Sequence, residues 1–423
     1  MDYVYSYSYT YEHKDLSRVS ALLAKLGDPH RSLRFVHVAG TNGKGSTCAM
    51  LSSILQHAGY RTGLFTSPHI LRYNERMQIN GNPIPDDELI TVTERVKEAI
   101  DSMEDKVNWF EMMMCSALLW FSIKKAEIIV FEVGLGGLLD ATNVIDPPEC
   151  AVITNIGLDH TAILGNTLEE IAFQKAGIVK HGSPVVIYRS TRSVEEVIEK
   201  KCLEVGAPII KTDFDSITTS DEDLFGQTFS AEGMSDLYIP LVGDHQKKNT
   251  CVVIKTVRAL RERGWSITDE DIRCGLKDTV WPVRFEVVSK DPLFVIDGGH
   301  NPQCAAAVVD TLRSLLPPDM RVVFLTGILA DKDYMEIIRI LSSVSKEFVT
   351  VTPDSYRALS SDQLASSLRS LSLNVSSCST VEEGIETAIS LANGGMVCCV
   401  GSLYLAGEVR RHFSADTSLK RLV

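Results

Sequence analysis

Residues 36–47 read VHVAGTNGKGST, the pattern of a strand, a glycine-rich turn and the start of a helix. A short apolar run leads into a glycine-rich turn, and an apolar-periodic helix follows through Leu55 and ends at Gly59. A strand that feeds such a turn at a helix N-terminus presents backbone N–H groups and the helix dipole to phosphate groups. Lys44 adds a point charge for the terminal phosphate oxygens of a nucleotide. We therefore expect a phosphate-binding loop made by Asn42, Gly43, Lys44, Gly45 and Ser46.

The loop differs from the common phosphate-loop pattern GxxxxGKS/T. Val38 stands where that pattern has its first glycine, and Gly45 delays the hydroxyl to Ser46. On local context alone, a glycine-rich turn with a purely structural role is the alternative interpretation. The pattern of the remaining chain has to decide between the two.

Apolar runs like the one before the loop recur and alternate with segments of helical periodicity. They cover residues 34–38, 128–133, 151–156, 184–187, 293–296, 322–326, 348–351 and 396–400. This alternation predicts an α/β fold with mainly parallel sheets. We expect a mainly parallel N-terminal domain with the phosphate loop at residues 1–285, and a smaller Rossmann-like α/β domain at residues 286–423. Pro282 lies beside the boundary and suits a hinge, because it restricts the backbone of its neighbours.

Composition excludes several classes of protein. The net charge of −13 argues against nonspecific binding to nucleic acid or to an acidic membrane. Residues 112–123 are apolar but bracketed by Glu111 and Lys124, so they fall short of the roughly 18 residues that a membrane span needs. We expect a buried helix there.

Cysteine usage and the N-terminus both indicate a cytoplasmic protein. The ten cysteines have no CxxC spacing and read as reduced core residues. The N-terminus lacks the basic start and apolar segment of a secretory signal. Its alternating tyrosines, from Tyr3 to Tyr11, read as surface packing. We expect a monomer that acts on small molecules.

Several short motifs lie along the chain in a characteristic order. They are GTNGKGS at 40–46, TSPH at 66–69, EVGLGGLLDATN at 132–143, LDH at 158–160, QKAGI at 174–178, GDHQ at 243–246 followed by Asn249, DGGHNP at 297–302 and DKD at 331–333. In sequence, order and spacing this set resembles the Mur ligase superfamily and, within it, the bacterial folylpolyglutamate synthase and dihydrofolate synthase family. The resemblance extends from about residue 15 to about residue 410.

The resemblance implies an ATP-dependent ligase that joins glutamate to a folate through an acyl phosphate. It implies two Mg²⁺ sites, ATP as co-substrate and, as a further option, a monovalent cation. Ser67, Glu132 and His160 are the implied metal ligands. The end of a buried strand is also where an open α/β sheet places ligands, although Glu132 could instead cap a helix. His160 could equally be a surface residue, since histidine is an unusual ligand for Mg²⁺.

Nucleotide contacts are implied in both predicted domains. Asn249 matches one such position, and Arg284 beside the hinge can neutralise phosphate charge. Asp297 and His300, after the first strand of the second domain, match two more. A turn-forming role is the alternative for Asp297, because it precedes two glycines.

The resemblance also assigns the substrate pocket and the catalytic side chains. Phe110 and Asp140 match positions of the pterin pocket. Lys44, Lys175 and His160 match catalytic positions, and Lys175 matches one where the family carries a carbamylated lysine. Without the resemblance, Lys175 reads as a solvated lysine on a helix surface.

Departures from the family pattern leave one activity open. Leu138 stands where the family usually has Arg, Val283 where it has Gly, and Gly299 where it has Ala. Residues 14–18 and 108–111 also differ, so dihydrofolate synthase activity is expected but a monofunctional folylpolyglutamate synthase is the alternative.

Three other classes fit the sequence less well. A Mur-type ligase acting on another carboxylate should carry an extra N-terminal domain, which the loop near residue 40 leaves no room for. A noncatalytic nucleotide-binding protein would not need Glu132, Lys175 and Asp297 together. A dinucleotide dehydrogenase would need GxGxxG after its first strand, which GLGG at 134–137 does not supply.

Overall fold

The computed structural model describes residues 15–415, which form two compact units. The first unit extends to Thr218 and also takes in Ser230–Leu237 and Lys247–Thr279. The second comprises Thr219–Phe229, Tyr238–Gln246 and the chain from Val280 onward. The tyrosines from Tyr3 to Tyr11, for which surface packing was expected, lie outside the described residues.

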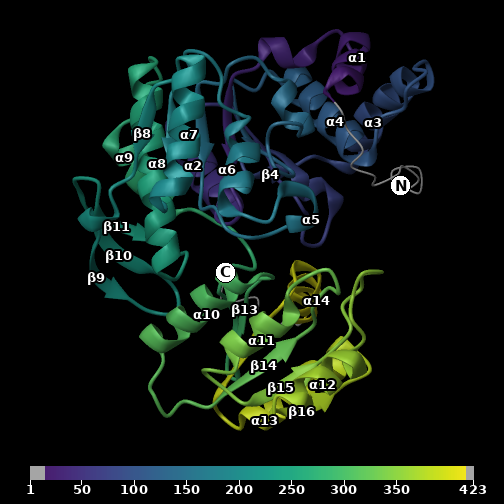
Figure 1. Ribbon diagram of the computed structural model, residues 1–423, viewed down its shortest axis with the longest axis vertical. Coiled ribbons are helices and arrows are strands. Elements are labelled where there is room, and N and C mark those ends of the chain that lie inside the picture. Colours follow the sequence, from purple (N-terminus) through teal and green to yellow (C-terminus); the bar gives the residue numbers. More distant parts are fainter. Residues whose placement is uncertain (1–14, 416–423) are drawn as a thin grey trace. The chain divides into compact units, whose positions relative to one another are not determined.

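The first unit is built on an eight-stranded sheet with the order β4-β3-β2-β5-β1-β6-β7-β8 (Figure 1). Its strands are β1 (Phe35–Ala39), β2 (Thr62–Phe65), β3 (Met77–Ile79), β4 (Asn82–Pro83), β5 (Ile128–Glu132), β6 (Cys150–Ile153), β7 (Val185–Ile187) and β8 (Ile209–Lys211). Only β3 and β4, at one edge, run antiparallel to their neighbours. β1 and β5 are buried throughout, as expected of strands covered on both faces. The predicted mainly parallel sheet is confirmed.

Helices cover both faces of this sheet. They are α1 (Ser17–Lys25), α2 (Lys44–His57), α3 (Asp86–Asp101), α4 (Trp109–Ile123), α5 (Thr161–Leu164), α6 (Leu168–Ala176), α7 (Arg192–Val205), α8 (Asp244–Glu262) and α9 (Asp269–Lys277). Phe35 and Phe131 share a core with α3 and α4, whereas α2 packs against β2 and β5. A hydrophobic core therefore lies on each face of the sheet.

Helix α4 confirms the buried helix expected at residues 112–123. It begins with a capping box, in which the Asn108 side chain accepts from Glu111 N at 2.9 Å and the Glu111 carboxylate accepts from Asn108 N at 2.7 Å. Residues 108–111 thus form the start of this helix. In the part of the chain that the structure describes, no helix combines the length and apolar character needed to cross a bilayer.

The second unit contains a six-stranded sheet with the order β12-β13-β17-β14-β15-β16, green to yellow in Figure 1. Its strands are β12 (Glu286–Lys290), β13 (Leu293–Ile296), β14 (Val322–Thr326), β15 (Glu347–Thr350), β16 (Asn374–Ser377) and β17 (Met396–Val400). Its helices are α10 (Pro302–Leu315), α11 (Tyr334–Leu341), α12 (Ser361–Ser370), α13 (Val381–Ala392) and α14 (Leu403–Ala415). All pairs are parallel except β12 with β13. The expected smaller α/β fold is confirmed.

A three-stranded sheet was not anticipated from the sequence. It consists of β9 (Thr218–Glu222), β10 (Gln227–Ala231) and β11 (Met234–Ile239). β9 reads TTSDE and is mostly exposed, so it gives no apolar signal.

All ten cysteines lie within residues 15–415 and are free, and most are buried. The expectation of reduced core cysteines is confirmed.

Candidate active site

The turn between β1 and α2 needs glycine at two positions. Gly40 has φ +153°, and a Cβ there would lie 1.8 Å from Thr154 Oγ1. Gly43 has φ +85°, caps α2, and would bring a Cβ within 2.6 Å of Asn249 Oδ1. The left-handed backbone and these close approaches exclude other side chains. Asn249, a predicted nucleotide contact, therefore lies directly against the predicted phosphate loop.

Residues after β6 anchor the same turn, and the sequence analysis did not identify them. Thr41 N donates to Asn155 O at 2.7 Å, and Thr154 Oγ1 donates to Asn42 O at 2.9 Å. Because Thr154 and Asn155 bind the turn, β6 ends at Ile153 and not at residue 156 as expected. Polar residues that follow a buried strand in a parallel sheet are the signal that could have identified them.

Two lysines share one acceptor beside this turn. Lys44 Nζ donates to Gly40 O at 3.1 Å and to Thr41 O at 3.3 Å. Lys175 Nζ, on α6, donates to the same Gly40 O at 2.8 Å. Lys175 is 3% exposed, so the alternative interpretation of a solvated surface lysine is wrong. Burial, followed by repulsion from Lys44, lowers the pKa of Lys175 to about 7.

Glu132 places a buried carboxylate next to these cations. It ends β5, is 4% exposed, and its Oε1 lies 4.0 Å from Lys44 Nζ. Its Oε2 accepts a hydrogen bond from Ser67 N at 3.0 Å. Ser67 follows β2, the parallel neighbour of β5, so sheet order brings the two residues together. The structure thus gathers Lys44, Lys175, Glu132 and Ser67 at the carboxyl ends of β1, β2 and β5. We call this end of the sheet the phosphate edge.

His160 lies on the turn that begins α5. It has φ +52°, its side chain is 41% exposed, and its Nε2 is 3.9 Å from Asp159 Oδ1. Asp159 is only 11% exposed and acts electrostatically on Lys175, raising its pKa against the effect of burial. Asp159 therefore belongs to this electrostatic cluster, although sequence reasoning singled out its neighbour His160.

The side chains at this edge fit Mg²⁺ bound together with a nucleotide. Among residues 15–415 no group of three His, Cys, Asp or Glu side chains could hold a metal by itself. Mg²⁺ at nucleotide sites uses one or two protein oxygens together with phosphate oxygens. The Glu132 carboxylate and the Ser67 hydroxyl supply oxygen ligands of that kind, next to a turn suited to phosphate.

A cavity of about 250 Å³ lies beside the same edge. Phe110, Asp140 and Gln174 are among its lining residues. The buried Asp140 carboxylate accepts from Leu135 N at 2.8 Å and from Thr142 N at 3.0 Å, while burial raises its pKa. Asp140 therefore holds the glycine-rich segment after β5 in the shape that forms the cavity wall. The structure places both predicted pterin residues at one cavity.

The remaining predicted nucleotide residues lie together in the second unit. The Asp297 carboxylate accepts from Phe285 N at 2.9 Å and from Gly299 N at 2.7 Å, which is the turn-forming arrangement. Arg284 is flanked by Val283 and Phe285, which have φ +54° and +49°. The Nδ1 atom of His300 lies 3.0 Å from Gly298 O. Asp297 thus joins the segment that carries Arg284 to the turn that carries His300.

A parallel sheet with a phosphate loop, a buried lysine and a strand-end carboxylate, followed by a second α/β unit, defines a class of ATP-dependent ligases. Two family models match this chain: the Mur ligase middle domain at residues 38–257 and the Mur ligase glutamate ligase domain at residues 283–403. The chain belongs to the folylpolyglutamate synthase and dihydrofolate synthase family of Mur ligases, as its motifs predicted. It is an ATP-dependent acid–amino-acid ligase.

Similar proteins cover nearly the whole chain. It is 34% identical to the folylpolyglutamate synthase of Lacticaseibacillus casei, covering 97% of this chain and 96% of that one. It is 36% identical to the dihydrofolate synthase/folylpolyglutamate synthase of Bacillus subtilis, covering 94% of each. A Mycobacterium tuberculosis folylpolyglutamate synthase solved with ADP and AMPPCP superposes with a TM-score of 0.88 at 30% identity, covering 95% of this chain and 96% of that one. E. coli FolC in complex with DHPP and ADP superposes with a TM-score of 0.86 at 30% identity, covering 98% and 96%.

Proposed function

We propose that this chain ligates L-glutamate to folates and also to 7,8-dihydropteroate. Support comes from relatives named as bifunctional dihydrofolate synthase/folylpolyglutamate synthases in B. subtilis and E. coli, and from the E. coli structure with DHPP. The cavity lined by Phe110 and Asp140 has a volume suited to a bicyclic pterin ring. It adjoins the edge of the sheet where the phosphate loop lies.

The reaction proceeds in two steps in this proposal. A carboxylate oxygen of the folate attacks the γ-phosphorus of ATP, and ADP leaves. The neutral amine of glutamate then attacks the acyl carbon, loses a proton, and inorganic phosphate leaves with the oxygen that came from the carboxylate. Both steps gather negative charge at the transferred phosphoryl group, so the main task of the protein is to position and stabilise charge.

The first unit supplies cations and ligands for that charge. The backbone of residues 42–46 and the Lys44 ammonium bind the phosphates, with Asn249 packed against Gly43. Glu132 and Ser67 would hold Mg²⁺, and His160 would bind a second cation. Mg²⁺, when bound, neutralises phosphate oxygens.

The second predicted domain, residues 286–423, supplies the glutamate side of the reaction in this proposal. The glutamate ligase model that matches residues 283–403 supports this division. Arg284, Asp297 and His300 then serve the nucleotide from the hinge and from the first strand end. We further propose that the chain works as a cytoplasmic monomer, which light scattering and cell fractionation test.

One observation carries the mechanism: two lysine Nζ atoms contact the single carbonyl oxygen of Gly40. Two ammonium groups this close repel each other, and burial of Lys175 favours its neutral form. A neutral Nζ can attack CO₂ and lose a proton, which gives a carbamate. An anion at this position attracts Lys44 and the metal ions where an ammonium would repel them. We therefore propose that Lys175 is carbamylated.

ADP release with glutamate, ATP and Mg²⁺ tests the proposed substrates. We expect release with both dihydropteroate and tetrahydrofolate, and a product heavier by one glutamate residue in each case. Release with tetrahydrofolate alone would define a monofunctional folylpolyglutamate synthase. Release with neither would refute the proposed function.

A further inference from the structure

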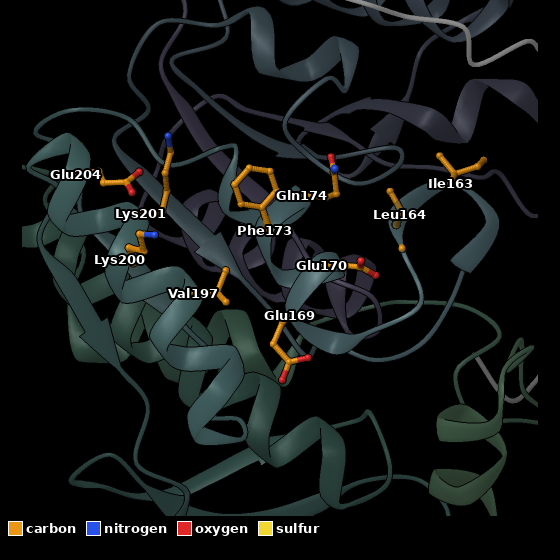
Figure 2. A pocket seen from close by; sticks show the side chains of 11 residues that line it. Ile163, Leu164, Glu169, Glu170, Phe173, Gln174, Val197, Lys200, Lys201 and Glu204 are labelled. Atoms are coloured by element: carbon orange, nitrogen blue, oxygen red, sulfur yellow. The ribbon is translucent and has the colours of Figure 1, made fainter.

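A second and larger cavity, of about 560 Å³, lies between α6 and α7 (Figure 2). Figure 2 shows Phe173 near its middle, with Lys200 and Lys201 at one end and Ile163 and Leu164 at the other. Ile163, Leu164 and Gln174 line both this cavity and the 250 Å³ cavity at the phosphate edge. The two cavities therefore adjoin, and a flexible ligand chain that leaves one can enter the other.

Cations without ion pairs mark the far end of this cavity. On the same helix, Arg192 pairs with Glu196 at 2.9 Å, and Lys211 of β8 pairs with Glu195 at 2.6 Å. Within the described part of the chain, Lys200 and Lys201 form no ion pair. Their charges are thus available to an anionic ligand, which is notable in a chain with a net charge of −13.

Most of the carboxylates in the cavity already have hydrogen-bond donors. Glu170 accepts from Asn166 N at 2.7 Å and completes the capping box of α6. Glu169 is hydrogen-bonded by the Ser193 side chain. Only Glu204 remains beside the two lysines, so that end of the cavity carries a net positive charge.

We propose that this cavity binds the γ-linked glutamate chain of folates that already carry several glutamates. The inference rests on the proposed function and extends it to the longer substrates. Each γ-linked residue adds one free α-carboxylate and two methylene groups. Lys200 and Lys201 face the carboxylates, while Phe173 and Val197 contact the methylene groups. In this arrangement the pterin ring lies in the smaller cavity and the reactive carboxylate lies at the phosphate edge. The internal glutamates then occupy the larger cavity.

The test compares monoglutamyl and triglutamyl tetrahydrofolate as substrates of a Lys200→Ala/Lys201→Ala variant. An exposed charge contact contributes about twofold to threefold, so we expect the KM for the triglutamate to rise about fivefold. The KM for the monoglutamate and kcat should stay within about twofold of the wild type. A Lys25→Ala/Lys277→Ala variant removes two exposed lysines elsewhere in the first unit and serves as the matched control. Lys200→Arg/Lys201→Arg should keep the preference for the longer chain.

Salt separates a charge contact from a structural effect. Raising KCl should reduce the wild-type preference for triglutamate over monoglutamate, and the double alanine variant should show no such change. Equal losses with both substrates, or no loss with either, would overturn the inference while the function stands. A wild-type enzyme that ligates glutamate to neither folate would overturn the proposed function, and this inference with it.

Discussion

The phosphate loop of the first unit and residues 283–285, which precede β12 in the second unit, both contain left-handed backbone but form it differently. In the first unit glycine adopts that conformation, at Gly40 and Gly43, and the nearby charged groups contact backbone carbonyls or each other. In the second unit Val283 and Phe285 adopt it, and the Asp297 carboxylate holds the backbone in place.

This difference separates chemical roles from structural ones. Glycine forms the phosphate loop without strain, so Lys44 and Lys175 are not needed to maintain its shape. The segment 283–285 of the second unit uses the Asp297 carboxylate as a hydrogen-bond acceptor and tolerates the β-branched Val283 in a strained conformation. Loss of charge should therefore impair turnover in the first unit and stability in the second.

Lys44→Ala should have the largest effect on turnover. Removing a phosphate-binding cation from a preorganised site costs about 10²- to 10³-fold in kcat. The free energy of unfolding should change by about 1 kcal/mol or less, because Gly40 O keeps its hydrogen bond from Lys175, and Glu132, whose Oε1 is 4.0 Å from Lys44 Nζ, keeps its hydrogen bond from Ser67 N. ADP release and urea denaturation measure the two quantities, with Lys277→Ala as control. Near-normal turnover would refute the phosphate-loop assignment.

Lys175→Ala should lower turnover about 10²-fold while ATP affinity stays largely intact. A short carboxylate such as acetate should restore part of the activity, because it refills the anionic position. Lys180→Ala is the matched control: Lys180 Nζ is also partly buried and donates to Asn143 O at 2.9 Å, but we expect no rescue there.

The pH dependence of wild-type activation by bicarbonate gives a second test of the same residue. The pKa of Lys175 is lowered to about 7, so its amine becomes neutral as the pH rises through 7. Activation in CO₂-depleted buffer should therefore increase from pH 6 to pH 8. A fully active Lys175→Gln variant that ignores bicarbonate is incompatible with a carbamate.

Asp297→Ala should destabilise the second unit by about 2–5 kcal/mol, because it leaves Phe285 N and Gly299 N buried without their acceptors. Asp310→Ala, at an exposed position on α10, is the control and should be nearly neutral. The midpoint of urea unfolding reports the change. If Asp297→Ala lowers turnover and leaves stability unchanged, the carboxylate acts on the nucleotide and not on the backbone.

Val283→Gly should have the smallest effect of these substitutions. Val283 and Val295 are both fully buried, but only Val283 has a positive φ. Glycine at 283 relieves the strain of the left-handed conformation, so Val283→Gly should cost about 1–2 kcal/mol less than Val295→Gly. Equal losses of unfolding free energy would show that the turn is not strained.

The sequence could predict the strands and the phosphate loop because their signals are local. Apolar β-branched runs define β1, β5 and β14, and the glycines of residues 40–45 report a backbone conformation directly. Contacts between distant segments left no such signal. The burial of Lys175 against Gly40 and the dual role of Asp297 as an acceptor depend on how helices and turns pack, and β9 carries too few apolar residues to be recognised.

In the proposed mechanism the first unit activates a carboxylate by phosphorylation. Folate labelled with ¹⁸O in its reactive carboxylate, incubated with ATP, Mg²⁺ and glutamate, gives a direct test of this step. An acyl phosphate intermediate requires one ¹⁸O atom in the inorganic phosphate for each amide bond formed, as mass spectrometry of the phosphate would show. Amide product with unlabelled phosphate would contradict the account.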